Sequence, residues 1–209
     1  MILDIWIVLC GCFVAGLGNG FLASMLGHHL KQFHLSVSEI GMVFVVSPLA
    51  YTTAAPVWGR LVNKYVSPRF LLTLGLALRI ICLLLIGPLP ISYLKPSLKL
   101  IIAGTIIQGI SMGSLFTGGL MDLIRLGKEH SSEGDAAITG LMGSLWGMTF
   151  SAGSFIGPSI SGLLIDVIGF RWESFTLSVL NLLTLILISS ITLHNKITFR
   201  EEAKTDSVT

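Results

Sequence analysis

Long apolar runs separated by short polar turns are the dominant pattern along this chain. Six of them approach or exceed the roughly 20 residues that an α-helix needs to cross a bilayer. They cover residues 5–26, 40–58, 70–89, 98–121, 136–165 and 174–193. Prolines fall inside the second run (Pro48 and Pro56) and the fifth (Pro158), and the backbone groups they free in lipid need partners on neighbouring helices. The pattern therefore predicts an all-α integral membrane domain over residues 1–193, with a polar tail over 194–209.

The composition supports a lipid environment. Hydrophobic residues make up 53% of the chain and charged residues 11%, with a mean hydropathy of +0.85, whereas soluble domains carry roughly 25% charged residues. The net charge of +2 is too small to indicate a nucleic-acid partner. The first run follows the acidic Asp4 and no basic segment, so we expect a retained span, not a secretory signal.

Basic residues divide unevenly between the two sides of the predicted bundle. Eight fall on one side: Arg60, Lys64, Arg69, Arg125, Lys128, Lys196, Arg200 and Lys204. Four fall on the other: Lys31, Lys95, Lys99 and Arg171. The positive-inside rule places the larger group in the cytoplasm, together with both chain ends and the polar tail. A multi-pass protein of the plasma membrane or of a secretory or endosomal vesicle fits this pattern equally well.

Small residues recur four positions apart inside the runs. The pairs are Gly16 and Gly20, Gly109 and Gly113, Gly143 and Gly147, and Gly153 and Gly157. Such pairs let two helix backbones approach closely, so they predict a tightly packed bundle. The alternative is that glycine is simply common in membrane helices.

One basic turn carries a family resemblance. The stretch "GRLVNKYVSPR", residues 59–69, resembles the loop signature of the major facilitator superfamily. Its matching positions are Gly59, Asn63, Lys64 and Arg69. In that family the signature joins the second and third spans of each half on the cytoplasmic side, which is also where the loop charges place this turn.

Two later stretches extend the resemblance over the whole chain. "GSFIGPSISGLL", residues 153–164, resembles the family's fifth-span motif and contains Gly153, Gly157 and Pro158. "DVIGFRWESF", residues 166–175, resembles the turn that follows. Because a polar tail follows the sixth span, the chain is similar to the C-terminal six-span half of such a protein. Within the superfamily it most resembles the vesicular amine and polyamine transporters, on "IVLCGCF", "GFLASML", "IGPLPI" and "IGFRW".

The resemblance implies transport of a small solute by a secondary, alternating-access carrier. An organic cation or a polyamine is the implied solute class. The other implied partners are the lipid bilayer and either a missing N-terminal half or a second copy. The chain departs from this group, because Ala23 and Ser24 stand where the group has an acidic residue and a proline. Gly147 stands where the monoamine members have an acidic residue, so a monoamine substrate is not implied for this chain.

Arg79 is the charged residue deepest inside a predicted span. A charge at that depth costs about 2.5–3.5 kcal/mol on insertion scales, so it usually faces a cavity or a partner. Arg79 is therefore predicted to lie on the substrate path, as an anion or carboxylate site or as part of a gate. The alternatives are a structural pair with a carboxylate such as Asp122, or snorkelling to the interface.

Other polar or amphipathic side chains lie deep in spans. Asn19, Gln108 and Trp146 are further candidates for the substrate path, and Trp146 could stack on a cation. Interhelical hydrogen bonding or plain packing is the alternative for each. In the signature turn, Asn63 and Lys64 are predicted to dock near Asp135 and hold a closed state. Asp135 also suits the N-cap of the fifth span.

The sequence favours a carrier over an enzyme. We find no catalytic pair at matched depth, no phosphate-binding glycine loop and no metal-ligand spacing, so neither a cofactor nor a metal is expected. The three cysteines, Cys10, Cys12 and Cys82, are expected to be small buried hydrophobes. The remaining alternative is a half-length membrane protein that does not transport but associates with a full transporter and modulates it.

Overall fold

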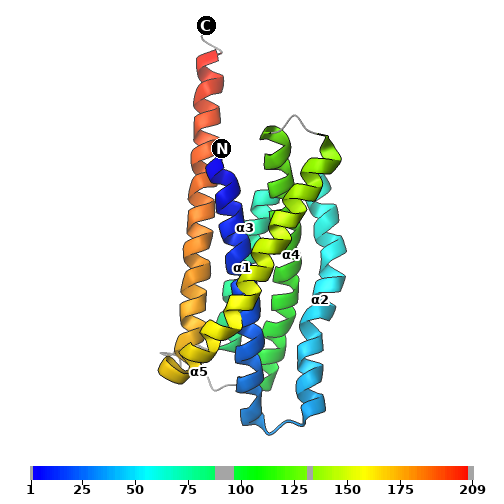
Figure 1. Cartoon of the computed structure of the whole chain (residues 1–209), viewed down its shortest axis with the longest axis vertical. Coiled ribbons are helices and arrows are strands. Elements are labelled where there is room, and N and C mark those ends of the chain that lie inside the picture. The colour runs from blue at the N-terminus through cyan, green and yellow to red at the C-terminus, as the bar shows by residue number, and fades with distance from the viewer. Residues whose placement is uncertain (1, 88–96, 131–133, 207–209) are drawn as a thin grey trace.

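The computed structural model describes residues 2–87, 97–130 and 134–206. Helices α1 (Ile2–Leu30), α2 (Val37–Lys64), α3 (Pro68–Ile86), α4 (Leu98–His130) and α5 (Asp135–Asp206) make up nearly all of it, with one 3-10 turn, η1 (Lys31–Phe33). These ranges contain no strand (Figure 1). The predicted all-α architecture is confirmed.

Six stretches within these helices are long and apolar enough to cross a membrane. They are Asp4–Ser24, Val37–Val62, Pro68–Ile86, Leu98–Glu129, Asp135–Ile165 and Trp172–Leu193, and we number them as the first to sixth spans. The third was predicted to reach residue 89, but α3 ends at Ile86, and residues 88 and 89 lie outside the described residues. The fourth extends beyond its predicted end at residue 121, because charged side chains on the last turns of α4 pair with one another and with α3.

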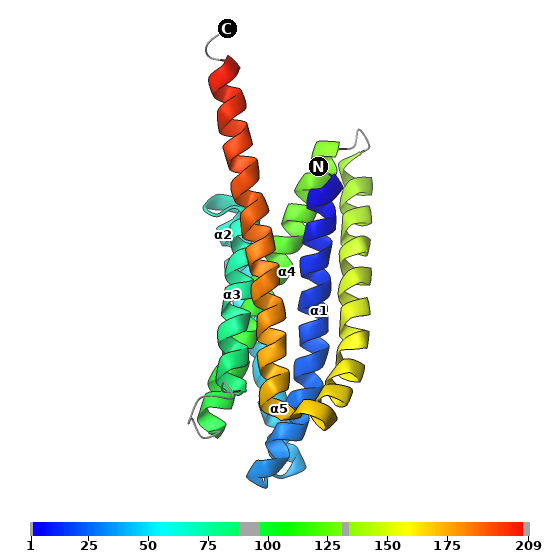
Figure 2. The same cartoon turned by 90° about the vertical axis from the view of Figure 1, so that its left-hand side faces the viewer.

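The fifth and sixth spans belong to one helix with a single break. We expected a connecting turn between residues 165 and 174, but only Gly169 inside α5 leaves the helical region, at φ 77° and ψ 163°. A positive φ is accessible to glycine without the clash that a Cβ would cause. One residue is therefore enough to reverse the direction of the chain between the two spans. Beyond the sixth span, α5 continues as a helix to Asp206 and projects past the bundle (Figure 2).

Local capping places the start of α3. Ser67 is the N-cap and accepts a hydrogen bond from the Phe70 backbone, and Pro68 occupies the first turn, where its missing N–H has no cost. The same helix end therefore holds Arg69 in a fixed position. At the opposite end of the bundle, Ser36 and Glu39 form a reciprocal capping box at the start of α2.

Glycines bring α1 and the fifth span into backbone contact. A Cβ on Gly16 or Gly20 would collide with the backbone of Phe150 or Ser154, and one on Gly153 or Gly157 would collide with α1. Figure 2 shows α1 flanked by the two limbs of α5. On α4, Gly109 packs in the same way against Ser47 of α2. Small residues therefore set how closely these helices approach.

The remaining glycine pair behaves differently. Gly143 and Gly147 have nothing within 4 Å of where a Cβ would stand, so they face away from the bundle.

Cys12 and Cys82 are buried as expected, but Cys10 is exposed on α1. The start of α1, the α2–α3 turn, the end of α4 and the start of α5 lie at the same end of the bundle (Figure 1).

Candidate functional site

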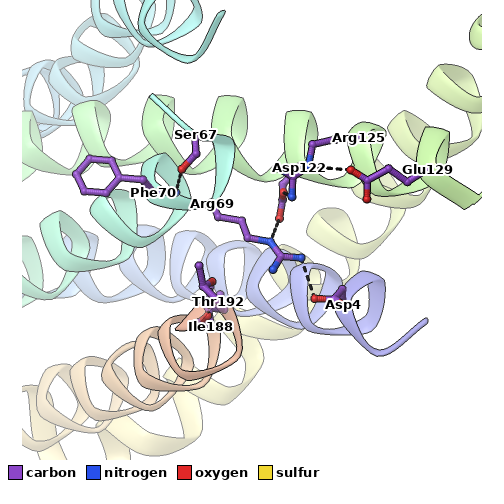
Figure 3. Close-up of polar contacts among 9 residues, drawn as sticks. All are labelled: Asp4, Ser67, Arg69, Phe70, Asp122, Arg125, Glu129, Ile188 and Thr192. Carbon is purple, nitrogen blue, oxygen red and sulfur yellow. Dashed lines mark hydrogen bonds and ion pairs between the residues drawn. The ribbon is translucent and has the colours of Figure 1, made fainter. Parts of the chain in front are cut away.

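Arg69 lies at the centre of an ion-pair cluster that joins three helices. Its Nη2 is 2.8 Å from Asp4 Oδ1 on α1, and its Nε is 3.0 Å from Asp122 Oδ2 on α4 (Figure 3). Arg125 Nη2 lies 3.2 Å from the other carboxylate oxygen of Asp122, whose side chain is 0% exposed. We call Asp4, Arg69, Asp122 and Arg125 the Arg69 cluster.

The Arg69 cluster can act as an electrostatic lock. Hydrogen bonds between charged groups are shorter and about twice as strong as neutral ones. Because the carboxylates come from α1 and α4 and the guanidinium from α3, separating these helices at this end would leave the buried Asp122 without its nearest cation. Such a separation is unfavourable unless another group replaces Arg69.

The other residues of the signature turn are placed differently. Gly59 faces open space. Lys64 is exposed, with its Nζ 5.5 Å from the ring centroid of Tyr65, and the side chain of Asn63 lies outside the described residues. Asp135 pairs with Lys128 at 2.8 Å, and the docking of Asn63 and Lys64 near Asp135 stays a prediction. Asp135 is the first residue of α5 and not its N-cap.

Arg79 is fully buried between α1, α3 and α4, with 0% of the residue exposed. Its Nη1 donates to Met112 Sδ on α4 at 3.3 Å. On the α1 side it lies against Gly18, where a Cβ would stand 2.9 Å from Nη2. The alternative that Arg79 pairs with Asp122 is wrong, because the cluster around Arg69 already holds that carboxylate.

Gln108 belongs to the same buried region as Arg79. Its Oε1 accepts from Cys82 Sγ at 3.5 Å. Cys82 follows Arg79 by one turn of α3, and Met112 follows Gln108 by one turn of α4, so the two contacts are adjacent rungs between these helices. The structure thus brings Arg79 and Gln108 together.

Trp146 lies in a different cluster from that pair. Trp146 is buried in an aromatic cluster, with its ring 5.7 Å from Phe116 and its edge against Gly119. Its Nε1 has no hydrogen-bond partner within the described ranges. Asn19 follows Gly18 on α1 and is half-buried.

The fifth-span motif lies at a helix–helix contact. Gly153 and Gly157 meet the backbone of α1, and Pro158 Cδ lies 2.7 Å from where a Cβ on Gly20 would stand. Ser154 adds a hydrogen bond from its Oγ to the Gly16 carbonyl at 3.2 Å. We therefore assign a packing role to this motif.

Sequence reasoning missed several partners. Asp4 was used only as evidence against a signal peptide, and Met112 and Cys82 are apolar in most settings. Glu173, at the start of the sixth span, is fully buried and accepts a hydrogen bond from Ser161 at 2.5 Å. The detectable signal for Asp4 and Asp122 was their position beside apolar runs, on the same predicted side as Arg69. Among the described residues, no group of three or more His, Cys, Asp or Glu side chains could hold a metal ion.

The fold and the buried charges define a multi-pass helical membrane protein with polar groups inside its bundle. The profile of the Major Facilitator Superfamily matches residues 8–204. The chain belongs to this superfamily, which places it with transporters and not with enzymes.

Similar proteins include the MFS-type transporter SLC18B1 of rat, with 31% identity over 170 residues, covering 80% of this chain and 36% of the relative. The human protein of the same name is 31% identical over 146 residues, covering 69% of this chain and 32% of the relative. An uncharacterized MFS-type transporter of Mycobacterium tuberculosis, Rv1250, is 25% identical over 171 residues, covering 82% and 27%. The matched region is thus about a third of each relative's length. SLC18B1 supports the resemblance to the vesicular amine and polyamine group.

Proposed function

We propose that this chain forms one six-span half of an alternating-access carrier that moves a small solute across a membrane. The carrier is of the secondary type, either ion-coupled or facilitative. In such carriers the substrate site lies near the bilayer midplane between two repeats, which rock around it. The observation that carries the proposal is a contrast between the outer faces of the fifth and sixth spans.

The sixth span presents large apolar side chains outward. Its exposed positions include Val179, Leu182, Leu183, Ile186 and Leu187, which suits contact with lipid tails. The fifth span also carries an apolar stripe, through Leu141, Met148, Phe155 and Leu163.

A second stripe of small residues runs beside it on the fifth span. Gly140, Ser144, Gly147 and Ser151 are all exposed and recur at helical spacing. Small and hydroxyl side chains are enriched where membrane helices meet other helices. This stripe therefore suits a second six-span half, either in the same polypeptide or in a second copy.

The lock and the path follow from the buried charges. In this proposal the Arg69 cluster closes the cytoplasmic end, where α1 begins and α5 ends, and Gly59, Asn63 and Lys64 flank that gate. Arg79, Asn19, Gln108 and Trp146 contribute to the path. An organic cation or polyamine, the class implied by the family resemblance, would need acidic groups from the other half, since these four side chains supply none. Membranes of the cell surface and of secretory or endosomal vesicles are the proposed locations.

Site-directed cross-linking tests the proposed pairing. Ser144→Cys or Ser151→Cys on the fifth span should form cross-links to the second half in native membranes, whereas Leu183→Cys on the sixth span should not. Equal cross-linking from all three positions would contradict the proposed interface. The exposed Cys10 is replaced by serine in every variant, and Cys12 and Cys82 are buried. The introduced cysteine is therefore the accessible thiol.

Uptake tests the path. Arg79→Leu should abolish uptake of labelled polyamine into vesicles that hold the complete carrier, with surface expression unchanged. Normal uptake by that variant would remove Arg79 from the path.

The second candidate function is a half-length protein that associates with a full transporter and modulates it. Like the carrier proposal, it fits a match to about a third of each relative's length. An antibody to the tail sequence "EEAKTDSVT" distinguishes the two on an immunoblot of the native source. A band near 22.5 kDa that co-purifies with a larger relative but does not support uptake would favour modulation. A band of about twice that mass, as expected for two repeats, would favour the carrier.

A further inference from the structure

The buried nitrogens around Arg79 form an incomplete hydrogen-bonding site. Nε and Nη2 of Arg79 and Nε2 of Gln108 have no acceptor in the described part of the chain. The remaining bond of Arg79 goes to a thioether sulfur, a weak acceptor. Arginine stays protonated in proteins, so the region holds a full positive charge and three donor nitrogens that lack a partner.

The carboxylates whose side chains the structure describes do not fill this gap. Among the described side chains, Asp4 and Asp122 bind Arg69, Glu129 lies beside Arg125, and Asp135 binds Lys128. Glu39 caps α2 and Glu173 accepts from Ser161. A second half docked on the outside cannot reach Arg79 either, because the residue is 0% exposed even without one.

The geometry of the unpaired nitrogens indicates what would bind. Nε and Nη2 form one edge of the guanidinium fork, and that edge matches the two oxygens of a carboxylate. Both nitrogens face Gly18 of α1, where a Cβ would stand 3.0 Å from Nε and 2.9 Å from Nη2. Gly18 places no side chain between α1 and this edge, so movement of α1 away from α3 would open space beside both nitrogens.

We propose that Arg79 and Gln108 form a binding site for a carboxylate-bearing solute, which enters when α1 moves away from α3 at Gly18. The carboxylate oxygens accept from Nε and Nη2 of Arg79, and Gln108 Nε2 donates a further hydrogen bond. This inference rests on the proposed carrier function, since both residues lie on the proposed path, and it assigns the solute an anionic group where the family resemblance implies an organic cation or a polyamine. It is tested by binding alone, so a failure of transport would not decide it.

The test is the thermal unfolding of the purified chain in detergent, titrated with sodium acetate. Sodium methanesulfonate keeps the ionic strength constant, and a parallel titration uses sodium chloride. Acetate should raise Tm of the wild type with saturation, and the shift should be absent in Arg79→Gln and retained in the exposed-arginine control Arg60→Gln. A saturable shift with chloride but not with acetate would overturn the carboxylate assignment. So would no shift, or an equal shift in Arg79→Gln.

A second variant keeps the test decisive if Arg79→Gln does not fold. Gln108→Leu removes one hydrogen bond to a charged ligand, worth at least about 1.5 kcal/mol. It should therefore raise the acetate concentration at half-maximal shift by about 10-fold. An unchanged midpoint in Gln108→Leu would overturn the assigned role of Gln108 and, with it, the two-residue site.

Discussion

Arg69 and Arg79 lie on the same helix, α3, in opposite surroundings. Arg69, near the helix start, is bound to carboxylates of α1 and α4. Arg79, further along, is more deeply buried and has only a sulfur acceptor in the described part of the protein. The two arginines show that charge in a membrane bundle has different consequences, according to whether the fold itself supplies the counter-ion.

The energetic difference follows from desolvation. Moving a charge out of water costs several kcal/mol, which is offset only where a well-placed partner and further hydrogen bonds are present. The Arg69 cluster supplies both. At Arg79 the described side chains do not offset this cost, so we expect the residue to lower stability and to serve in binding.

The largest expected effect is at Arg69. Arg69→Leu leaves Asp122 buried without its nearest cation, so we expect a loss of about 3–5 kcal/mol in the free energy of unfolding. Chemical denaturation of the purified chain in mixed micelles measures it. In the control Arg125→Gln, the lost partner of Asp122 is a half-exposed side chain, and the change should stay within about 1 kcal/mol. Equal losses in the two variants would contradict a lock centred on Arg69.

Replacing Arg79 should change the free energy of unfolding in the opposite direction. In buffer without carboxylates, Arg79→Met removes an unpaired buried charge and keeps an unbranched apolar side chain. We expect a gain of up to about 2.5–3.5 kcal/mol, the cost of a central charge on insertion scales. The same denaturation experiment measures it. A loss as large as that of Arg69→Leu would mean that Arg79 has a structural counter-ion.

A smaller effect is expected at Gly18. A Cβ there would press on the guanidinium edge of Arg79, so Gly18→Ala should cost about 1–3 kcal/mol through overpacking. In the Arg79→Met background the same substitution should cost less, which a double-mutant cycle would detect as coupling between the two sites. Additive effects would show that Gly18 does not shape the Arg79 site.

Much of the fold was predictable because lipid imposes a simple rule. Apolar runs of sufficient length become spanning helices, and the six predicted spans are all present in the structure. The boundaries were less predictable. The fourth span continues past its apolar run through paired charges, and one glycine at positive φ replaces the expected loop before the sixth span. Both depend on tertiary contacts or single-residue conformations that hydropathy does not encode.

The sequence was sufficient to identify the residues of the candidate site, but not the residues that they contact. The depth of Arg79 and the amide of Gln108 indicated buried polar groups, and the structure brings the two together. The structural alternative for Arg79, a pair with Asp122, was wrong because Asp122 lies at the end of the bundle where it binds Arg69. Spacing along the chain could not show that Asp4 of α1 reaches Arg69, since that contact depends on how three helices pack.

The most direct test of the difference between the two arginines is an NMR spectrum of the arginine Nε–H groups. The chain is labelled with ¹⁵N-arginine, the Arg69 and Arg79 signals are assigned from Arg69→Gln and Arg79→Gln, and acetate is titrated in. We predict that the Arg79 signal shifts with saturation while the Arg69 signal, held by Asp122 at 3.0 Å, stays in place. An Arg79 signal that does not respond, or two signals that move alike, would contradict the account.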